Sequence, residues 1–225
     1  MLRKLGDELL RRGSMQGTWI DVGAHNGEHT KGYARLNPAL RIYAFEPNLR
    51  VAASMIGHAP NFVVIPMAVA EQDGSAEFHI NAHDQASSLL PLNERGVRSW
   101  IGGEPLRVES VVTVPAIRLD TFLRLMHIPS VDFLKIDAQG ADLGVLKSAG
   151  DRLRDIHNIV LEVSTASQSC YLGAPSKQEV LAFLDSAGFS LVKTEPQSHG
   201  QEENLSFTRI SQDSHFPLNN GSPSA

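Results

Sequence analysis

The sequence predicts one doubly wound α/β domain with a mostly parallel sheet over residues 15–210. Three observations support this fold class. Strand and helix patterns alternate along the chain, the first strand runs into a glycine-containing turn at residues 21–27, and the second strand ends in the carboxylate of Glu46. In such folds the turns at the carboxyl ends of the strands form the ligand site.

The first half of the domain begins with an apolar run over residues 19–22, which is typical of a buried strand and stops at Gly23. Asn48 is placed to cap a later helix, and Pro66 indicates a strand end. The expected elements are a helix over 28–36, a strand over 41–45, a helix over 48–56, a strand over 62–67 and a short strand over 76–80.

The second half follows a long segment, residues 81–110, that has little periodicity and carries serine and glycine pairs. We expect this segment to be an insert or lid over the site. The alternation then resumes, and an antiparallel pair of strands closes the sheet. The expected elements are strands over 109–115, 132–136, 156–163, 189–193 and 205–210, with helices over 119–126, 141–148 and 176–187.

Two segments flank the domain. Residues 1–14 carry leucines on one helical face and predict a short amphipathic helix, whereas the polar residues 211–225 predict a disordered tail.

The composition argues against several function classes. The 225 residues are 42% hydrophobic and carry a net charge of −5 without a long basic run, so binding to nucleic acid is not expected. No stretch approaches the roughly 20 apolar residues that a membrane span needs. The single Cys170 excludes an internal disulfide and fits a reducing compartment. We therefore expect a cytoplasmic protein without stable membrane insertion, and a homodimer stays open.

The turn at residues 21–27 favours a ligand without phosphates. Gly23 and Gly27 let the backbone pass close to a ligand, but His25 stands where a dinucleotide site needs its middle glycine. The charge of Asp21 would repel pyrophosphate and favour a cationic group. S-adenosylmethionine carries a sulfonium and an ammonium, so the turn favours this cofactor over NAD. A strand–turn–helix that binds nothing is the alternative.

Glu46 lies where a carboxylate can accept hydrogen bonds from two ribose hydroxyls. A surface carboxylate that caps the next helix is the alternative. Ala68 follows the third strand, where the edge of an adenine would meet the backbone; close packing is the alternative there.

These segments resemble the FkbM-type methyltransferases, in order and over nearly the whole domain. The matching segments are Asp-Val-Gly-Ala-His-Asn-Gly (21–27), Phe-Glu-Pro (45–47), Pro-Met-Ala-Val-Ala (66–70), Ser-Ser-Leu-Leu (87–90), Ile-Arg-Leu-Asp (117–120), Phe-Leu-Lys-Ile-Asp-Ala-Gln-Gly-Ala-Asp (133–142) and Leu-Glu-Val (161–163).

The resemblance implies a class I methyltransferase fold with a seven-stranded, Rossmann-like sheet, S-adenosyl-L-methionine as donor, and usually O-methylation of a hydroxyl. Acceptors in the family vary and include sugars and other metabolites. With the chemistry of the turn, it predicts cofactor contacts at Asp21, Gly23, His25, Asn26, Gly27, Glu46, Pro47 and Ala68.

The chain departs from the family pattern after residue 136. The family often has Asp-x-Glu-Gly-x-Glu where residues 137–142 read Asp-Ala-Gln-Gly-Ala-Asp. Gln139 looks like a tolerated variant, whereas Asp142 is a shorter acid, so no role is carried over to it.

Asp137 and Glu162 are the candidate catalytic residues. Asp137 follows a buried strand and could act as general base, orient an acceptor hydroxyl, bind the donor's ammonium, or ligate a metal with Glu162. A helix N-cap is its structural alternative. Glu162 ends an apolar strand, and a salt bridge to Lys135 is its alternative.

Ser87 and Ser88 are candidate substrate contacts, with a local turn as the alternative. The histidines show no metal-binding spacing, so no metal ligands are assigned.

The sequence therefore predicts an S-adenosylmethionine-dependent methyltransferase that acts on a hydroxyl of a small metabolite or glycan. An NAD-dependent oxidoreductase and a non-catalytic S-adenosylmethionine-binding protein are the two alternatives.

Overall fold

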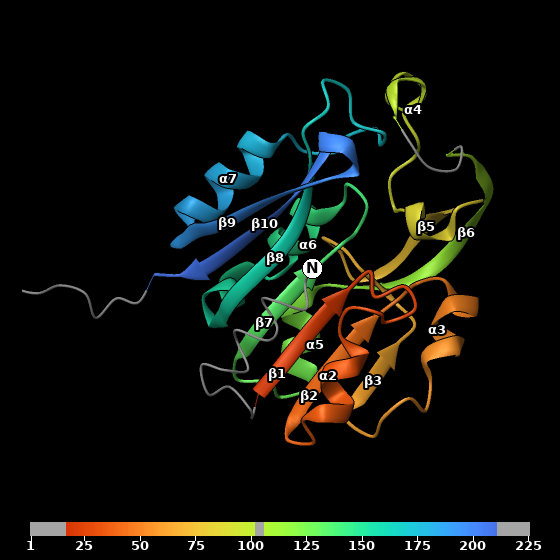
Figure 1. Ribbon diagram of the computed structural model, residues 1–225. Coiled ribbons are helices and arrows are strands. Elements are labelled where there is room, and N and C mark those ends of the chain that lie inside the picture. Colours follow the sequence, from red (N-terminus) through yellow and green to blue (C-terminus); the bar gives the residue numbers. More distant parts are fainter. Residues whose placement is uncertain (1–16, 102–105, 211–225) are drawn as a thin grey trace, which may run out of the picture.

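The computed structural model describes residues 17–101 and 106–210 (Figure 1). The helix expected over 1–14 and the tail over 211–225 lie outside the described residues. The strands of the main sheet are β1 (Gly17–Val22), β2 (Leu40–Phe45), β3 (Phe62–Ile65), β7 (Val131–Ile136), β8 (Ile156–Ser164), β9 (Phe189–Gln197) and β10 (Glu202–Arg209).

The seven strands lie in the order β3-β2-β1-β7-β8-β10-β9. The pairs from β3 to β8 are parallel, and β10 is antiparallel to both β8 and β9. This confirms the predicted doubly wound, mostly parallel sheet with an antiparallel C-terminal strand. The chain reverses direction across the sheet between β1 and β7, so the turns after these two strands meet at one edge.

The helices and short 3-10 turns complete the layers. They are α2 (Lys31–Leu36), α3 (Leu49–Met55), η1 (Asp84–Ala86), α4 (Glu94–Ser99), α5 (Leu119–Leu125), α6 (Asp142–Ser148), η2 (Gly150–Asp155), α7 (Lys177–Ser186) and η3 (Ser198–Gly200). The side chain of Asn48 accepts from the backbone N–H of Arg50 and caps α3, as predicted. The helix expected from residue 28 begins at Lys31 instead.

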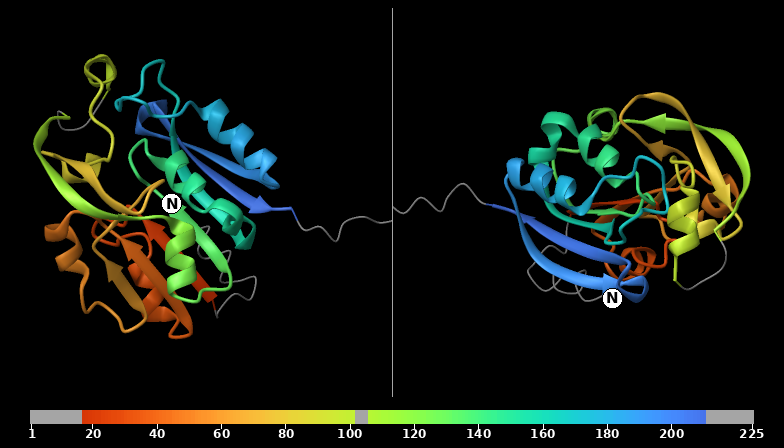
Figure 2. Two further views of the ribbon diagram at one scale, coloured as in Figure 1. Left: turned by 180° about the vertical axis from the view of Figure 1, so that it is seen from behind. Right: turned by 90° about the horizontal axis from the view of Figure 1, so that it is seen from above.

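Apolar side chains form a core on each face of the main sheet. Trp19 packs with Tyr33 of α2 and Phe133 of β7, with ring centroids 5.1 and 5.0 Å apart. On the other face Ile20 and its neighbours pack with α5, α6 and α7. Accordingly α2 lies in front of the sheet in Figure 1, and α5 and α6 lie in front of it in the rear view of Figure 2.

A second, three-stranded sheet lies beyond the carboxyl ends of β1, β2 and β3 (Figure 1). Its strands are β4 (Ala68–Val69), β5 (Gly74–Asn81) and β6 (Val108–Ile117), in the order β4-β6-β5. The sequence predicted one strand over 62–67, but β3 ends at Ile65 and the chain turns into β4. Pro66 stands at this break, because proline cannot donate to a strand ladder.

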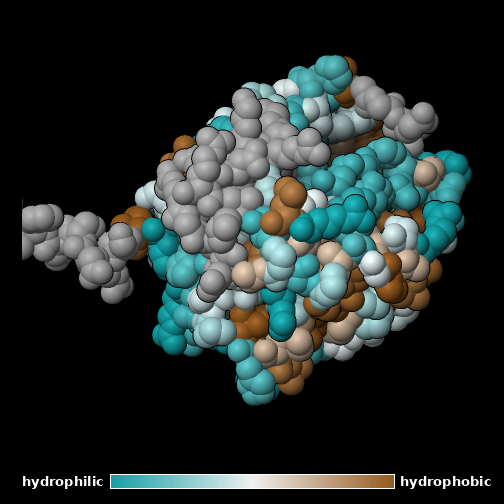
Figure 3. All heavy atoms as spheres, turned by 60° about the horizontal axis from the view of Figure 1, so that its bottom comes forward, coloured by the Kyte–Doolittle hydropathy of each residue, from teal (hydrophilic) through white to brown (hydrophobic). Residues whose placement is uncertain are grey.

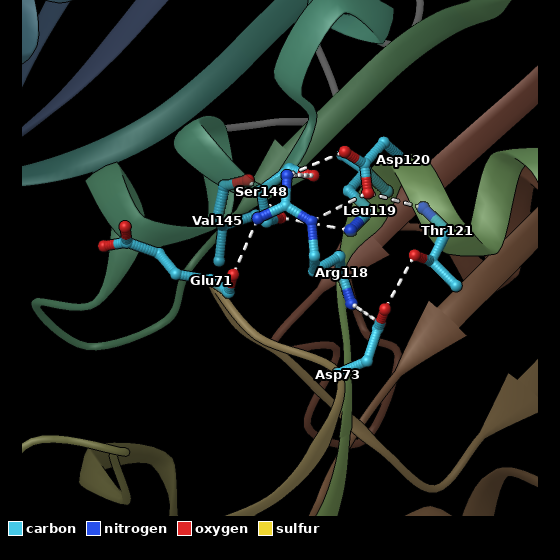
Figure 4. Close-up of polar contacts among 8 residues, drawn as sticks. All are labelled: Glu71, Asp73, Arg118, Leu119, Asp120, Thr121, Val145 and Ser148. Atoms are coloured by element: carbon cyan, nitrogen blue, oxygen red, sulfur yellow. Dashed lines mark hydrogen bonds and ion pairs between the residues drawn. The ribbon is translucent and has the colours of Figure 1, made fainter.

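Arg118 joins the second sheet to the helices (Figure 4). Its guanidinium donates to both carboxylate oxygens of Asp120 at 3.0 and 2.7 Å, and to the carbonyls of Glu71 and Ser148 at 2.6 and 3.2 Å. The hydrogen bonds that Arg118 donates to Asp120 raise the pKa of Arg118. The Ile-Arg-Leu-Asp segment (117–120) is therefore a structural junction away from the cavity described below.

The surface carries scattered apolar side chains. On the face seen in Figure 3 they are interspersed with polar ones. Among the described residues, none of the helices has both the length and the apolar character required to cross a membrane.

Candidate active site

A cavity of about 670 Å³ lies at the carboxyl ends of β1, β2, β7 and β8, under the second sheet. Its walls come from segments far apart in the sequence. At one end, here called the glycine-turn end, it is lined by Gly23, His25, Glu46, Pro47 and Ala68. At the other, here called the carboxylate end, it is lined by Asp137, Glu162 and Glu202.

Gly23 is required by close packing between two turns. Its φ of +69° lies in the left-handed region, and a Cβ here would be 1.9 Å from the carbonyl oxygen of Asp137. The carbonyl of Gly23 in turn accepts a hydrogen bond from Lys135 Nζ at 2.9 Å. The turn after β1 is thus held directly against the turn after β7.

Asp21 is fully buried and does not line the cavity. It pairs with Lys135 Nζ at 2.9 Å and accepts from Thr30 Oγ1 at 2.5 Å. Burial lowers the pKa of Lys135, but the charges of Asp21 and Asp137 outweigh this effect and raise it overall. The charge of Asp21 is therefore matched inside the protein. The buried position of Asp21 does not support the expectation that its side chain faces a ligand. The contact between Asp21 and the cofactor stays a prediction.

Glu46 is held in place by two backbone N–H groups. It accepts from His25 at 2.9 Å through Oε2 and from Asn48 at 2.8 Å through Oε1. Burial raises the pKa of Glu46, and these two hydrogen bonds oppose the rise. Each oxygen keeps a further lone pair, so the carboxylate is fixed in the cavity wall with acceptor capacity to spare.

The remaining residues of the turn divide into two groups. His25 lines the cavity, with a φ of +48°, and its Nε2 lies 3.0 Å from Asp84 Oδ1. Asn26 and Gly27 do not line it. Asn26 accepts from the backbone N–H of Glu28 at 2.9 Å, and Gly27 faces Met55 and Phe62.

The carboxylate end gathers acidic side chains from three neighbouring segments. Glu162 on β8 pairs in register with Asn204 on β10, so Glu202, two residues earlier, lies on the same face. Burial and the charges of Asp137 and Glu202 raise the pKa of Glu162 to about 9. Burial also raises the pKa of Glu202, which accepts from Ser198 Oγ at 2.5 Å.

Asp137 is one-third exposed and faces two donors. Its Oδ1 accepts from Gln139 Nε2 at 2.7 Å, and its Oδ2 lies 3.7 Å from Lys135 Nζ. The salt bridge between Lys135 and Glu162 that was the alternative for Glu162 does not appear among the ion pairs of the described residues.

Asp142 organises the turn after β7 instead of facing the cavity. It accepts from the backbone N–H groups of Ala138 at 3.2 Å and Gly140 at 3.1 Å. Burial and the charge of Asp137 raise its pKa to about 7.

The predicted serine pair also divides. Ser87 lines the cavity and accepts from the backbone N–H of Asn81 at 3.1 Å. Ser88 is buried and donates to the carbonyl of Gln139 at 2.8 Å. Within residues 17–101 and 106–210, no three histidine, cysteine, aspartate or glutamate side chains are arranged to hold a metal ion.

Sequence reasoning missed Glu202 and Tyr171. Glu202 could have been found from the expected antiparallel pairing of residues 205–210 with the strand that carries Glu162. Tyr171, which lines the cavity from an irregular segment, gave no signal in the sequence.

Comparison with known proteins identifies the chain. The family described as the methyltransferase FkbM domain matches residues 21–191. This chain belongs to the FkbM methyltransferase family. Membership in this family shows that the protein is an S-adenosylmethionine-dependent methyltransferase. It does not favour the NAD-dependent oxidoreductase or the non-catalytic S-adenosylmethionine-binding protein.

One relative of this FkbM protein is the 2-O-methyltransferase NoeI of Sinorhizobium fredii (strain NBRC 101917 / NGR234). It is 25% identical over 189 residues, which cover 79% of this chain and 74% of NoeI.

Two solved structures are similar in fold to this chain. M. capricolum TrmK in complex with S-adenosyl-homocysteine has a TM-score of 0.50 at 8% identity, over 90% of this chain and 66% of TrmK. A fibrillarin/Nop5p complex gives a TM-score of 0.50 at 12% identity, over 90% of this chain and 79% of the matched chain.

Proposed function

We propose that this FkbM protein transfers a methyl group from S-adenosylmethionine to a hydroxyl of a small metabolite or glycan. One observation carries the proposal: a single cavity joins Glu46 at the glycine-turn end to Asp137, Glu162 and Glu202 at the carboxylate end. The first set suits an adenosine-containing donor, and the second suits a hydroxylated acceptor.

The glycine-turn end would hold the donor. Glu46 is buried, fixed by two N–H groups, and has acceptor capacity left for ribose hydroxyls. Pro47 and Ala68 line the same wall and offer an apolar surface for the adenine.

The carboxylate end would receive the acceptor. When bound, S-adenosylmethionine would supply a methyl carbon that bonds to the acceptor oxygen as its bond to the positively charged sulfur breaks, with S-adenosylhomocysteine as the leaving group. Asp137 Oδ2 would take the proton of the acceptor hydroxyl, while Lys135 and Gln139 steady the carboxylate. Glu162, whose pKa is raised to about 9, keeps its proton at neutral pH and can donate to a second acceptor oxygen.

The chemistry of this end favours a polyhydroxylated acceptor. Carboxyl groups bind hydroxyls as acceptors and donors, and the partly exposed ring of Trp100 in the same cavity offers a flat face to a sugar or other ring. The name of the relative NoeI, a 2-O-methyltransferase, agrees with an oxygen acceptor.

A screen with labelled donor tests the proposal. The protein is incubated with [13C-methyl]-S-adenosylmethionine and a panel of monosaccharide glycosides and small alcohols, and the product methyl group is assigned by NMR. We expect a methoxy product from at least one hydroxylated acceptor. Transfer only to amine acceptors would contradict the proposal.

Binding provides a second test that needs no acceptor. Calorimetry should show S-adenosylhomocysteine binding and no binding of NADH. Binding of NADH alone would overturn the assignment of the glycine-turn end.

Two further expectations belong to this proposal. We infer that the enzyme is cytoplasmic, and we propose a homodimer as its assembly. Analytical ultracentrifugation at several concentrations would show a monomer if the homodimer is wrong.

A further inference from the structure

Gln139 lies where three segments meet. It follows β7 in the turn that Asp142 organises, and its φ of +51° is a left-handed conformation that is unfavourable for a non-glycine residue. Its carbonyl accepts from Ser88 Oγ at 2.8 Å. Its side-chain amide touches both Tyr171 and Asp137. A strained residue that links so many groups beside the cavity is a candidate for function.

The amide of Gln139 has one sensible orientation. Its Nε2 donates to Asp137 Oδ1 at 2.7 Å, and its Oε1 accepts from the hydroxyl of Tyr171 at 2.8 Å. Rotating the amide by half a turn would set its carbonyl oxygen against the Asp137 carboxylate, and neither atom of that contact would then carry a proton to donate. The amide therefore presents an N–H group to Asp137.

The hydroxyl of Tyr171 reaches the amide oxygen of Gln139, which is the nearer of its two acceptors. Burial raises the pKa of Tyr171, so the phenol keeps its proton. Its hydroxyl also lies 3.0 Å from the carbonyl of Ala86, at the end of η1. Tyr171 is 7% exposed, and its Cβ packs against Gly140. Tyr171 thus contacts the backbone both at Gly140, in the turn after β7, and at the end of η1.

Resting on the function proposed above, we propose that Gln139 and Tyr171 are positioning residues for the carboxylate of Asp137. Tyr171 orients the amide of Gln139, and that amide donates to Asp137 Oδ1. Oδ2 is then left facing Lys135 and the acceptor. An N–H donor favours the ionised carboxylate, whereas a carboxylate at position 139 would oppose it.

Several other groups act on Asp137 and enter any measurement of its titration. They lie on β7, the turn after β1, α6, β8, the irregular segment after β8, and β10: Lys135, His29, Asp142, Glu162, Tyr171 and Glu202.

The sharpest test replaces the amide by a carboxylate of the same shape. In Gln139→Glu, position 139 can still accept from Tyr171 but can donate to Asp137 only by holding a proton. With 13C-labelled aspartate and the S-adenosylhomocysteine complex, the NMR titration midpoint of Asp137 should move to higher pH by about one unit or more. The Asp137→Asn spectrum assigns the signal. Gln178→Glu, the same change at an exposed site on α7, should leave the midpoint where it is.

Tyr171→Phe removes only the hydroxyl and keeps the ring that packs on Gly140. We expect a smaller shift of the same sign, because the amide loses its orienting donor but not its contact with Asp137. With an acceptor found in the screen, kcat should fall at least threefold in both variants while KM for S-adenosylmethionine changes less than twofold.

The outcomes separate the two proposals. An unmoved Asp137 midpoint in a folded Gln139→Glu protein, judged by its melting temperature and by S-adenosylhomocysteine binding, would overturn the positioning role. Wild-type protein that binds S-adenosylhomocysteine but methylates no hydroxyl would instead overturn the proposed function and leave the NMR result standing.

Discussion

The two ends of the cavity are built in different ways. The glycine-turn end is made mostly by two short contiguous segments that directly follow a strand, residues 23–25 after β1 and Glu46-Pro47 after β2, with Ala68 of β4 beside them. The carboxylate end is assembled from β7, β8 and β10 and from an irregular segment that carries Tyr171. The methyl donor is always the same molecule, so its site needs one constant geometry, and local turns supply this geometry. An acceptor site can vary while the sheet stays the same, because its walls come from separate segments.

The largest expected effect separates catalysis at the carboxylate end from binding at the other. Asp137→Asn keeps the shape and the contact with Gln139 but removes the proton acceptor. General base groups contribute about 100-fold or more, so we expect kcat to fall by about 100-fold. The dissociation constant for S-adenosylhomocysteine, measured by calorimetry, should change less than about threefold.

Asp185→Asn, an exposed substitution on α7, is the matched control. A near-normal kcat in Asp137→Asn would show that Asp137 does not act as the base. The carboxylate end would then not be the catalytic end of the cavity.

The converse substitution lies at the glycine-turn end. Glu46→Gln keeps one oxygen acceptor and loses the charge, and each charge-assisted hydrogen bond is worth about 1.5–3 kcal/mol. We expect S-adenosylhomocysteine to bind about 10-fold or more weakly by calorimetry. Glu77→Gln, an exposed change on β5, should have no effect. Undiminished binding in Glu46→Gln would refute its role toward ribose.

Much of this division could be predicted from the sequence. The alternation of elements, the turn and Glu46 follow from local patterns, because parallel strands bring their carboxyl ends to one edge. The position of Asp21 could not be foreseen, since its pairing with Lys135 depends on the register of β1 and β7. Glu202 enters the site only through the antiparallel register of β10, and Tyr171 through packing on Gly140. The second sheet could not be predicted either, because the sequence patterns of its strands do not differ from those of the main sheet.

Glu162 at the carboxylate end should lower the free energy of unfolding as the pH rises from 4.5 toward 9. The pKa of Glu162 is raised from 4.5 to about 9 in the folded protein. Below pH 4.5 both states hold the proton. As pH rises toward 9, the unfolded state loses a proton that the folded state keeps, so the free energy of unfolding falls across this window.

Glu162→Gln removes this penalty without changing the shape. We expect its melting temperature to exceed that of the wild type by a few degrees at pH 8, with the difference vanishing toward pH 4.5. Equal melting temperatures at pH 8 would show that Glu162 is not held in its protonated form.

The smallest effect concerns an ion pair at the edge of the glycine-turn end. His25 and Asp84 join the glycine turn to η1 through partly exposed side chains, and such pairs contribute about 0.2–1 kcal/mol. Asp84→Asn should weaken S-adenosylhomocysteine binding by no more than about threefold, seen as faster dissociation in stopped-flow fluorescence of Trp100. A tenfold loss would place this pair in the donor site itself.

The division of the cavity is tested most directly by a crystal structure with S-adenosylhomocysteine bound. We predict that the ribose hydroxyls lie on Glu46 and that the sulfur faces Asp137 across the remaining space. A ribose bound away from Glu46, or a sulfur turned from the carboxylate end, would contradict this account.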